Sequence, residues 1–270
     1  HYILPEWACR GMATVQAVLA WRRQVPDEPE RLPVDQAAAR AVLDAAPAGY
    51  LTEDQSLAVL AAYGLPVPPS RLCTTPEEAA AFADQIGYPV VLRVVSPQIV
   101  HKWDVGGVVL NLSDAAAVRT AYDQMLRRIA GRIPGAAIHG VLVRREIASG
   151  YELILGAKRD PVFGPTLMFG LGGIYVELFA DVTFGLAPIG RPGALRMVQQ
   201  VKAHRLLEGA RGGPPADVAG IVECLMRVGQ LISDFERIAE LDVNPLIAGP
   251  AAVGNAVADV RIKLGPEGSS

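Results

Sequence analysis

This sequence has few aromatic residues and a small net charge. Its composition and its charge each exclude some classes of protein. Among 270 residues, 6% are aromatic, 51% are hydrophobic and 20% are charged. That composition is typical of a globular chain long enough for two compact units, and it excludes a disordered or fibrous protein. Because 25 Lys and Arg residues nearly balance 28 Asp and Glu residues, giving a net charge of -3, no electrostatic argument favours binding to nucleic acid or to an anionic membrane. Any phosphate binding would have to be local.

Cysteines and long hydrophobic runs are also few. Cys9, Cys73 and Cys224 lie far apart without metal-binding spacing, which is typical of a reduced, cytoplasmic compartment where thiols are buried or idle. The longest uncharged windows, residues 161–176 and 243–258, are interrupted by Gly and Pro. They are too short for a membrane span.

The first 33 residues are predicted to be the end of a preceding unit. Residues 1–23 begin extended and become helical with one apolar face. Residues 26–33 (PDEPERLP) form a charged, Pro-rich linker that no core would hold. Because the chain also begins at His1 without an initiator Met or a signal pattern, we expect a piece of a longer polypeptide.

Residues 34–70 are predicted to contain two helices that lead into the first lobe. Residues 34–46 are Ala-rich and helical, and residues 49–51 form a turn. Thr52 begins the second helix, because a Thr followed by a Gln three residues later is typical of a helix N-terminus. This helix is expected to stop at Gly64.

The remaining chain is predicted to form two lobes. In residues 71–146, strands at 71–73, 89–95, 107–112 and 140–146 are interleaved with helices at 76–86 and 114–130, which indicates α/β layers. In residues 147–264, we expect strands at 151–158, 166–169, 174–178, 182–188, 239–247 and 256–262, with helices at 194–206 and 216–235. This second lobe is therefore of the α+β kind, and residues 265–270 form a tail.

The stretch 96–108 (SPQIVHKWDVGGV) follows the apolar strand 89–95 and carries the residues best suited to phosphate chemistry. A neutral imidazole such as His101 is a competent nucleophile, Lys102 supplies a mobile point charge, and two adjacent glycines let backbone amides approach an anion. Taken alone, a His-Lys pair on a loop is more often solvated surface.

Two further segments combine charge or glycine with strands. In GYELILGAKRDPVFGP (150–165), Glu152 lies within a predicted strand and a charge cluster at its end, which by itself is typical of a solvated hairpin rim. The segment FGLGGIYVE (169–177), which includes Gly172 and Gly173, lacks the third glycine of a dinucleotide fingerprint and no helix pattern follows it. Its glycines are equally consistent with a tight turn.

The clearest metal signal lies near the end of the chain. In ELDVNPL (240–246), Asp242 and Asn244 stand two apart on a predicted strand, so both side chains point to one face. Asp259 follows in the next strand pattern. Mg²⁺ prefers hard oxygen ligands, commonly one or two carboxylates together with nucleotide phosphates. The earlier segment LEGARGGPPAD carries Arg211, which without further context is a surface loop arginine.

Together these segments resemble the NDP-forming acyl-CoA synthetases (the ADP-forming acetyl-CoA synthetase family) from about Leu51 to Leu264. The segment 96–108 is similar to that family's SPxIxHKxDVGGV loop, and the four other segments match its motifs in the same order. ELDxNP followed by a strand Asp is shared widely by ATP-grasp enzymes. The resemblance implies a two-lobed ATP-grasp fold that binds ATP or ADP with Mg²⁺, and it places residues 1–33 at the end of a CoA-binding half.

The resemblance also implies roles for individual residues. His101 would carry a phosphoryl group, Asp242 would be a partner for the phosphohistidine, and Lys102 with Arg93 would neutralise phosphate charge. Asn244 and Asp259 would bind Mg²⁺. The remaining implied nucleotide-site residues are Val143, Arg145 and Glu146 in the adenine-clamping hinge, Glu152 as a ribose or metal-side carboxylate, Gly172 and Gly173 in the glycine-rich floor, and Arg211.

The implied reaction is acyl-CoA + ADP + phosphate ⇌ acid + ATP + CoA, with a CoA-binding half, fused or separate, as partner and as the route to an oligomer. Two positions depart from the family pattern: Arg93 replaces a lysine, and Trp103 replaces a small Ser or Thr. The alternative is a nucleotide-binding or regulatory module without turnover, as in protein acetyltransferases that contain a synthetase-like region. The retained His101, Asp242, Asn244 and Asp259 favour the enzyme.

Overall fold

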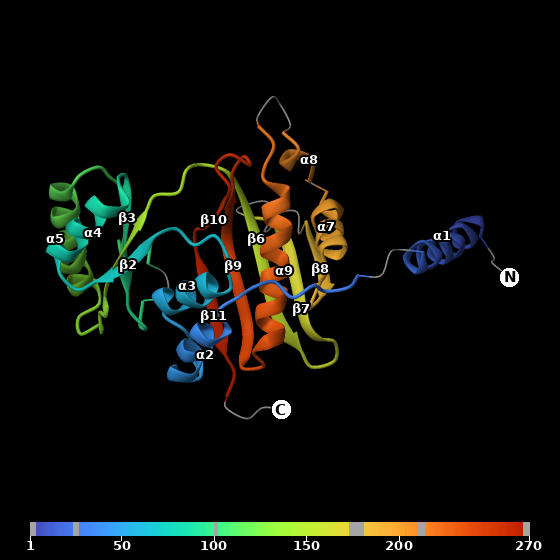
Figure 1. Cartoon of the computed structure of the whole chain (residues 1–270), viewed down its shortest axis with the longest axis horizontal. Coiled ribbons are helices and arrows are strands. Elements are labelled where there is room, and N and C mark those ends of the chain that lie inside the picture. The colour runs from blue at the N-terminus through green and yellow to red at the C-terminus, as the bar shows by residue number, and fades with distance from the viewer. Residues whose placement is uncertain are drawn as a thin grey trace.

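Two lobes, each built on an antiparallel sheet, make up the body of the molecule (Figure 1). The computed structural model describes residues 4–23, 27–99, 102–172, 181–202, 204–209 and 214–266. The smaller lobe holds a four-stranded sheet and the larger a seven-stranded sheet, so the predicted two-lobed α/β and α+β organisation agrees with the structure.

The small lobe has the strand order β2-β5-β3-β4. Its elements are β2 (Ser70–Cys73), α4 (Pro76–Ile86), β3 (Val90–Val95), β4 (Val108–Leu112), α5 (Ala115–Arg132) and β5 (Gly140–Arg145). Helix α4 begins where the Thr75 hydroxyl accepts a hydrogen bond from the backbone N–H of Glu78, and it ends at Gly87, whose φ is 80°. All six residues of β3 are buried, as its apolar run predicts, and they include the charged Arg93.

The large lobe has the strand order β1-β11-β9-β6-β7-β8, with β10 paired to β9. Its strands are β1 (Gly49–Tyr50), β6 (Tyr151–Asp160), β7 (Gly164–Leu171), β8 (Val182–Leu186), β9 (Ile238–Ala248), β10 (Asn255–Val257) and β11 (Val260–Leu264). Its helices are α2 (Gln36–Ala45), α3 (Glu53–Ala62), α7 (Arg191–Gln200), α8 (His204–Leu207) and α9 (Val218–Asp234). Helix α9 carries ten buried residues and packs against β6, β7 and β9, so it anchors the main core.

Three element predictions were wrong. Gly49–Tyr50 does not turn but pairs with β11. The helix expected at 194–206 is split between α7 and α8, because Val201 adopts an extended ψ of 128°. The strand expected at 256–262 is interrupted at Ala258 and Asp259, between β10 and β11. The strand expected at 174–178 lies outside the described residues.

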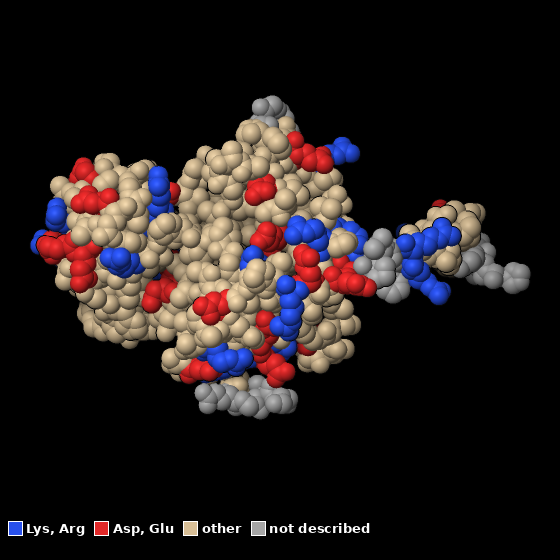
Figure 2. Space-filling model, in the orientation of Figure 1, with Lys and Arg blue, Asp and Glu red and all other residues tan. Residues whose placement is uncertain are grey.

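Helix α1 (Pro5–Arg22) stands apart from both lobes (Figure 1). The predicted helix is confirmed, and its apolar side chains are exposed: Trp7 by 51%, Met12 by 62% and Val15 by 58%. An apolar face of this kind is normally covered by a partner surface. Within the described part of the chain, no helix has the length and apolar character needed to cross a membrane. Acidic and basic side chains are interspersed on the face shown in Figure 2.

The linker that follows α1 is held against the large lobe, contrary to the prediction that no core would hold it. The carboxylate of Asp27 accepts hydrogen bonds from the backbone N–H groups of Gly190 and Gly193, at 3.0 and 2.7 Å, at the start of α7. A Cβ at Gly193 would collide with this carboxylate, so glycine is what permits the approach. Further along, the side-chain amide of Gln230 exchanges two hydrogen bonds with the backbone of Leu32. The pattern of apolar residues in the sequence could not predict this contact. The backbone donors that bind Asp27 lie 163 and 166 residues away from it.

We predict that Asp27→Ala destabilises the large lobe. Helix α7 has no side-chain cap of its own, and Asp27 supplies the missing acceptors from a distant segment. Loss of a helix cap costs about 0.5–2 kcal/mol of unfolding free energy, measurable by urea denaturation. Glu28→Ala, a neighbouring exposed carboxylate, is the matched control and should change stability little. Equal stability of the two variants would contradict the capping role.

Candidate functional site

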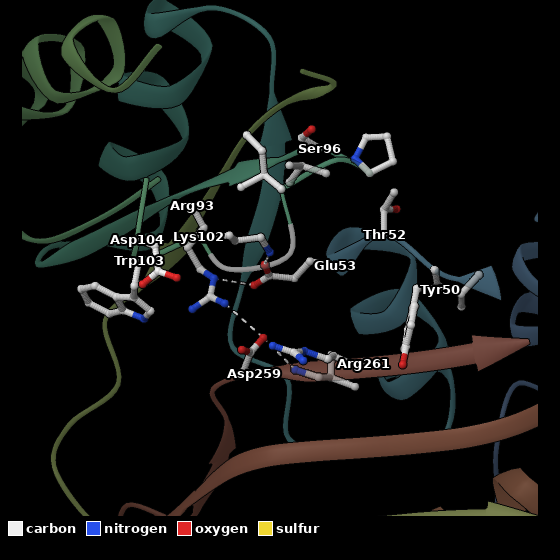
Figure 3. A pocket seen from close by; sticks show the side chains of 15 residues that line it. Tyr50, Thr52, Glu53, Arg93, Ser96, Lys102, Trp103, Asp104, Asp259 and Arg261 are labelled. Atoms are coloured by element: carbon white, nitrogen blue, oxygen red, sulfur yellow. Dashed lines mark hydrogen bonds and ion pairs between the residues drawn. The ribbon is translucent and has the colours of Figure 1, made fainter. Parts of the chain in front are cut away.

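A cavity of about 540 Å³ lies where the two lobes meet (Figure 3). The residues that line it come from the start of α3, from β3 and the segment that follows it, and from the start of β11: Tyr50, Leu51, Thr52, Glu53, Arg93, Val95, Ser96, Pro97, Ile99, Lys102, Trp103, Asp104, Asp259, Val260 and Arg261. Charged groups of both signs face each other at its base. The cavity therefore joins the predicted phosphate loop to the predicted metal-binding segment.

Arg93 connects the two lobes at the base of this cavity. Its Nε lies 2.7 Å from Glu53 Oε1, and its terminal Nη2 lies 3.0 Å from Asp259 Oδ1. Burial would lower the pKa of the guanidinium, but the two carboxylates outweigh that effect and raise the pKa. The predicted role of Arg93 was phosphate binding, and here both carboxylates already engage it. A planar fork can bind two separate carboxylates, which a lysine ammonium on one stem does less well.

Glu53 is the central residue that the sequence analysis missed as a site residue. It is the first residue of α3, and only 6% of its surface is exposed. Burial by itself would raise the pKa of this carboxyl, yet Arg93 and Lys102 together hold the pKa below its usual range. Its local pattern, an acid in the first turn of a helix, is common at solvated helix N-termini, so no local signal distinguishes it.

Arg144 is a second residue that the sequence analysis missed. Its side chain is buried in β5 and donates a hydrogen bond of 2.7 Å to the carbonyl oxygen of Ala258, beside Asp259. Burial, followed by repulsion from Arg93, lowers the pKa of Arg144 to about 10. The cations Arg93, Lys102 and Arg144 thus lie near the carboxylates Glu53 and Asp259. The charged residues that line the cavity balance in number: Arg93, Lys102 and Arg261 against Glu53, Asp104 and Asp259. Of the cations available to an anionic ligand, Arg93 and Lys102 are already paired with carboxylates.

The predicted phosphate loop is described at residues 96–99 and from Lys102 onward, whereas His101 lies outside the described residues. The Lys102 ammonium forms an ion pair with Glu53 Oε2. The backbone carbonyl of Lys102 accepts a 2.7 Å hydrogen bond from Gly107 N–H, and a Cβ at Gly107 would collide with Val94. Glycine is therefore needed here for close packing against β3. Trp103 lines the cavity and is 63% exposed.

The two predicted metal ligands, Asn244 and Asp259, lie side by side, and Asp242 lies two residues before Asn244 in β9. The backbone N–H of Asn244 donates to the carbonyl oxygen of Asp259 at 3.1 Å. Burial, repulsion from Glu240 and repulsion from Asp259 raise the pKa of Asp242 despite Arg261. Among the described residues, no group of three or more His, Cys, Asp and Glu side chains is placed to hold a metal ion. A metal ion bound by Asp259 would also need the amide oxygen of Asn244 and oxygen atoms from a bound molecule.

A second cavity, of about 780 Å³, lies beside the connection between the lobes and includes Arg145 and Glu146 in its lining. The Glu146 carboxylate accepts a 2.9 Å hydrogen bond from the backbone N–H of Asn111. Val143 is not among the lining residues: its side chain is fully buried in the small-lobe core, and its backbone is paired with Leu92 and Arg71. Of the three residues predicted for the hinge, Arg145 and Glu146 therefore line this cavity and Val143 does not.

The remaining predicted nucleotide-site residues are only partly described. The backbone N–H of Gly172 donates to the carbonyl oxygen of Glu152 at 2.6 Å, so these two residues are brought together. A Cβ at Gly172 would lie 3.1 Å from the Glu152 backbone. Glycine at this position therefore allows the two backbone segments to lie close together. Gly173 and Arg211 lie outside the described residues.

We predict that Arg93 cannot be replaced by lysine without a loss of stability. Arg93→Ala should cost about 3–5 kcal/mol of unfolding free energy, because it leaves two carboxylates near the lobe junction without a partner. Arg93→Lys should recover only part of this, since one ammonium replaces two separate nitrogen contacts. The measurement is urea denaturation, with Arg127→Lys on the exposed surface of α5 as the matched control. Full stability of Arg93→Lys would contradict the bridging role.

Comparison with known proteins identifies the family. A family model described as an ATP-grasp domain matches residues 42–264. The acetate–CoA ligase [ADP-forming] I subunit beta of Pyrococcus furiosus is 41% identical over 73% of this chain and 85% of its own length. The 4-hydroxybutyrate–CoA ligase [ADP-forming] of Nitrosopumilus maritimus is 40% identical over 98% of this chain, which spans 38% of that protein's length.

Among solved structures, one neighbour is the Ca. Korarchaeum cryptofilum dinucleotide forming acetyl-coenzyme A synthetase 1 in complex with coenzyme A and Mg-AMPPCP, with its phosphohistidine segment pointing towards the nucleotide binding site. It superimposes with a TM-score of 0.74 at 43% identity, covering 84% of this chain and all (100%) of that chain. The family match over residues 42–264 and the match to most of a beta subunit agree with each other. The chain therefore belongs to the ATP-grasp domain family and, within it, to the group of the ADP-forming acetate–CoA ligase beta subunits.

Proposed function

We propose that this chain is the nucleotide-binding portion of an ADP-forming acyl-CoA synthetase. In this role it passes a phosphoryl group between a phosphohistidine at His101 and ADP or ATP. The observation that carries the proposal is the cluster of paired charges at the lobe junction, because Lys102 directly follows His101 in sequence and lies in that cluster beside Arg93. Phosphoryl transfer depends mainly on positioning and on neutralising phosphate charge, and these residues supply both.

The two cavities suggest how a nucleotide lies in the cleft. The base and ribose fit the larger cavity beside Arg145 and Glu146, next to the connection between the lobes. The phosphates then extend toward Arg93 and Lys102 in the cavity of about 540 Å³. In the Korarchaeum neighbour, a nucleotide analogue and a phosphohistidine segment occur in one structure, which supports the same pairing here.

The oxygen donors fit a Mg²⁺ ion that is completed by nucleotide phosphates. The Asp259 side chain is 31% exposed, so it stays open to a ligand although its Oδ1 pairs with Arg93, and Asn244 is exposed beside it. Both are hard oxygen donors of the kind that Mg²⁺ prefers. When bound, the ion would neutralise phosphate charge. Asn244 and Asp259 would hold it, and Asp242 would be a partner for the phosphohistidine.

Completion of the reaction requires a CoA-binding half. Nearly the whole chain, including the segment with α1, matches part of a longer ligase. The exposed apolar side chains of α1 are the surface that such a half would cover. We therefore assign α1 and the docked linker to the connection between halves, and we expect the oligomer to form through the CoA-binding half. The thiols Cys9, Cys73 and Cys224 are all free, in keeping with a cytoplasmic enzyme.

We predict that Asn244→Ala weakens ADP binding only when Mg²⁺ is present. Loss of the amide oxygen should raise the Kd for Mg·ADP about tenfold, or ~1.4 kcal/mol, while the Kd measured in EDTA stays unchanged. Titration calorimetry of the chain with both forms of the nucleotide provides the measurement. Asp259→Asn should behave similarly, and Asp123→Ala on the exposed face of α5 serves as control. Equal losses with and without Mg²⁺ would refute the metal assignment.

The decisive experiment is phosphorylation of the chain by ATP labelled at the γ-phosphate. The bond between the γ-phosphorus and the bridging oxygen breaks, a nitrogen–phosphorus bond forms at His101, and ADP leaves. The wild-type chain should acquire an acid-labile label. His101→Ala should acquire none yet bind Mg·ADP normally, because this residue acts on the transferring group. His139→Ala, an exposed histidine in the small lobe, should label as the wild type does. A wild-type chain that binds nucleotide without labelling would favour the regulatory module.

A further inference from the structure

We propose that Glu53 is a positioning residue for phosphoryl transfer, which it assists by holding Lys102 beside Arg93 at the lobe junction. The inference rests on the proposed function and extends it to a residue in the large lobe. Glu53 belongs to α3, whereas both of its cationic partners belong to the small lobe. One carboxylate thus acts across the junction on two cations.

The geometry divides the two oxygens of this carboxylate between the two cations. Oε1 lies 2.7 Å from Nε of Arg93, within β3, and Oε2 pairs with the ammonium of Lys102, nine residues later. The side chains converge on Glu53 from the small lobe (Figure 3). Glu53 therefore binds both Arg93 of β3 and Lys102, so that two parts of the small lobe contact one residue of the large lobe.

Helix formation does not account for a carboxylate at this position. At the start of α3 the backbone N–H of Thr52 donates to Gln55 Oε1 at 3.1 Å, so the side chain that serves the helix N-terminus is that of Gln55. The Glu53 side chain is only 3% exposed. A buried charge is costly unless it is paired, so the position is explained by its cations.

The carboxylate determines where Lys102 can be. Two cations repel each other, and Lys102 and Arg93 can stay together only while Glu53 lies between them. With Glu53 in place, a phosphoryl group that enters the cavity meets both cations already positioned. With a neutral amide in its place, Lys102 would move toward solvent, while Arg93 would remain paired with Asp259.

This arrangement separates the transfer rate from nucleotide affinity. Glu53 competes with phosphate oxygens for the same cations, so Glu53→Gln should leave the Kd for Mg·ADP within about twofold of wild type or make binding tighter. The rate of His101 labelling by γ-labelled ATP should nevertheless fall by at least about tenfold. A merely structural role would weaken binding and labelling together.

The test is a double-mutant cycle on the chain, with single-turnover labelling and calorimetry with Mg·ADP for each protein. Lys102→Met should slow labelling, and Glu53→Gln combined with Lys102→Met should be no slower than the slower single variant, because the carboxylate acts through Lys102. Glu77→Gln, the same change at an exposed first-turn position of α4, is the matched control and should label at the wild-type rate.

Several outcomes would overturn the inference alone, given a wild-type chain that labels. One is that Glu53→Gln labels at the wild-type rate. Another is that the rate reductions caused by Glu53→Gln and Lys102→Met multiply in the double variant. The third is that Glu53→Gln loses affinity for Mg·ADP to the same extent as it loses labelling rate. If Glu53→Gln does not fold, Lys102→Met decides, and labelling at the wild-type rate by that variant overturns the inference. A wild-type chain that fails to label overturns the proposed function and this inference together.

Discussion

The contact on which the arrangement of the two lobes depends is the pairing of one guanidinium with two carboxylates. Arg93 is in the middle of a fully buried strand of the small lobe, and both of its partners, Glu53 and Asp259, come from the large lobe. Burial of these groups is favourable only while they remain together. The pairing therefore fixes β3 against the beginning of α3 and the beginning of β11, and the cavity between the lobes follows from that placement.

Asp259 lies at the break between β10 and β11, where the backbone is still bonded to β9. The backbone N–H of Ala258 donates to the carbonyl oxygen of Pro245 at 2.9 Å, and the carbonyl oxygen of Asp259 accepts from the backbone N–H of Asn244 at 3.1 Å. The contact with β9 therefore brings Asn244 next to Asp259. The carbonyl oxygen of Ala258 accepts a hydrogen bond of 2.7 Å from the buried Arg144. This backbone acceptor satisfies part of the hydrogen-bonding requirement of a buried cation.

The sequence predicts the parts of this site that are local and misses those that depend on the fold. The apolar run of β3 and the separation of Asp242 from Asn244 are periodic features, and both led to the correct strands. Glu53 and Arg144 gave no local signal, since an acid in a first helical turn and an arginine near a strand end are ordinary on a solvated surface. The linker at 27–33 was misread for the same reason: its partners at α7 and α9 are contiguous with it only in the folded chain.

The arginine at position 93, where the resemblance leads us to expect a lysine, has a structural explanation in its contacts. A lysine would offer one ammonium, which could serve phosphate or one carboxylate, whereas the arginine binds two carboxylates through separate nitrogens. Arg93 therefore attaches the lobes to each other and also places a cation in the lining of the cavity. Lys102 supplies a second cation to the cavity, where it is paired with Glu53. The arginine at this position therefore strengthens the contact between the lobes, and its presence is compatible with the proposed phosphoryl transfer.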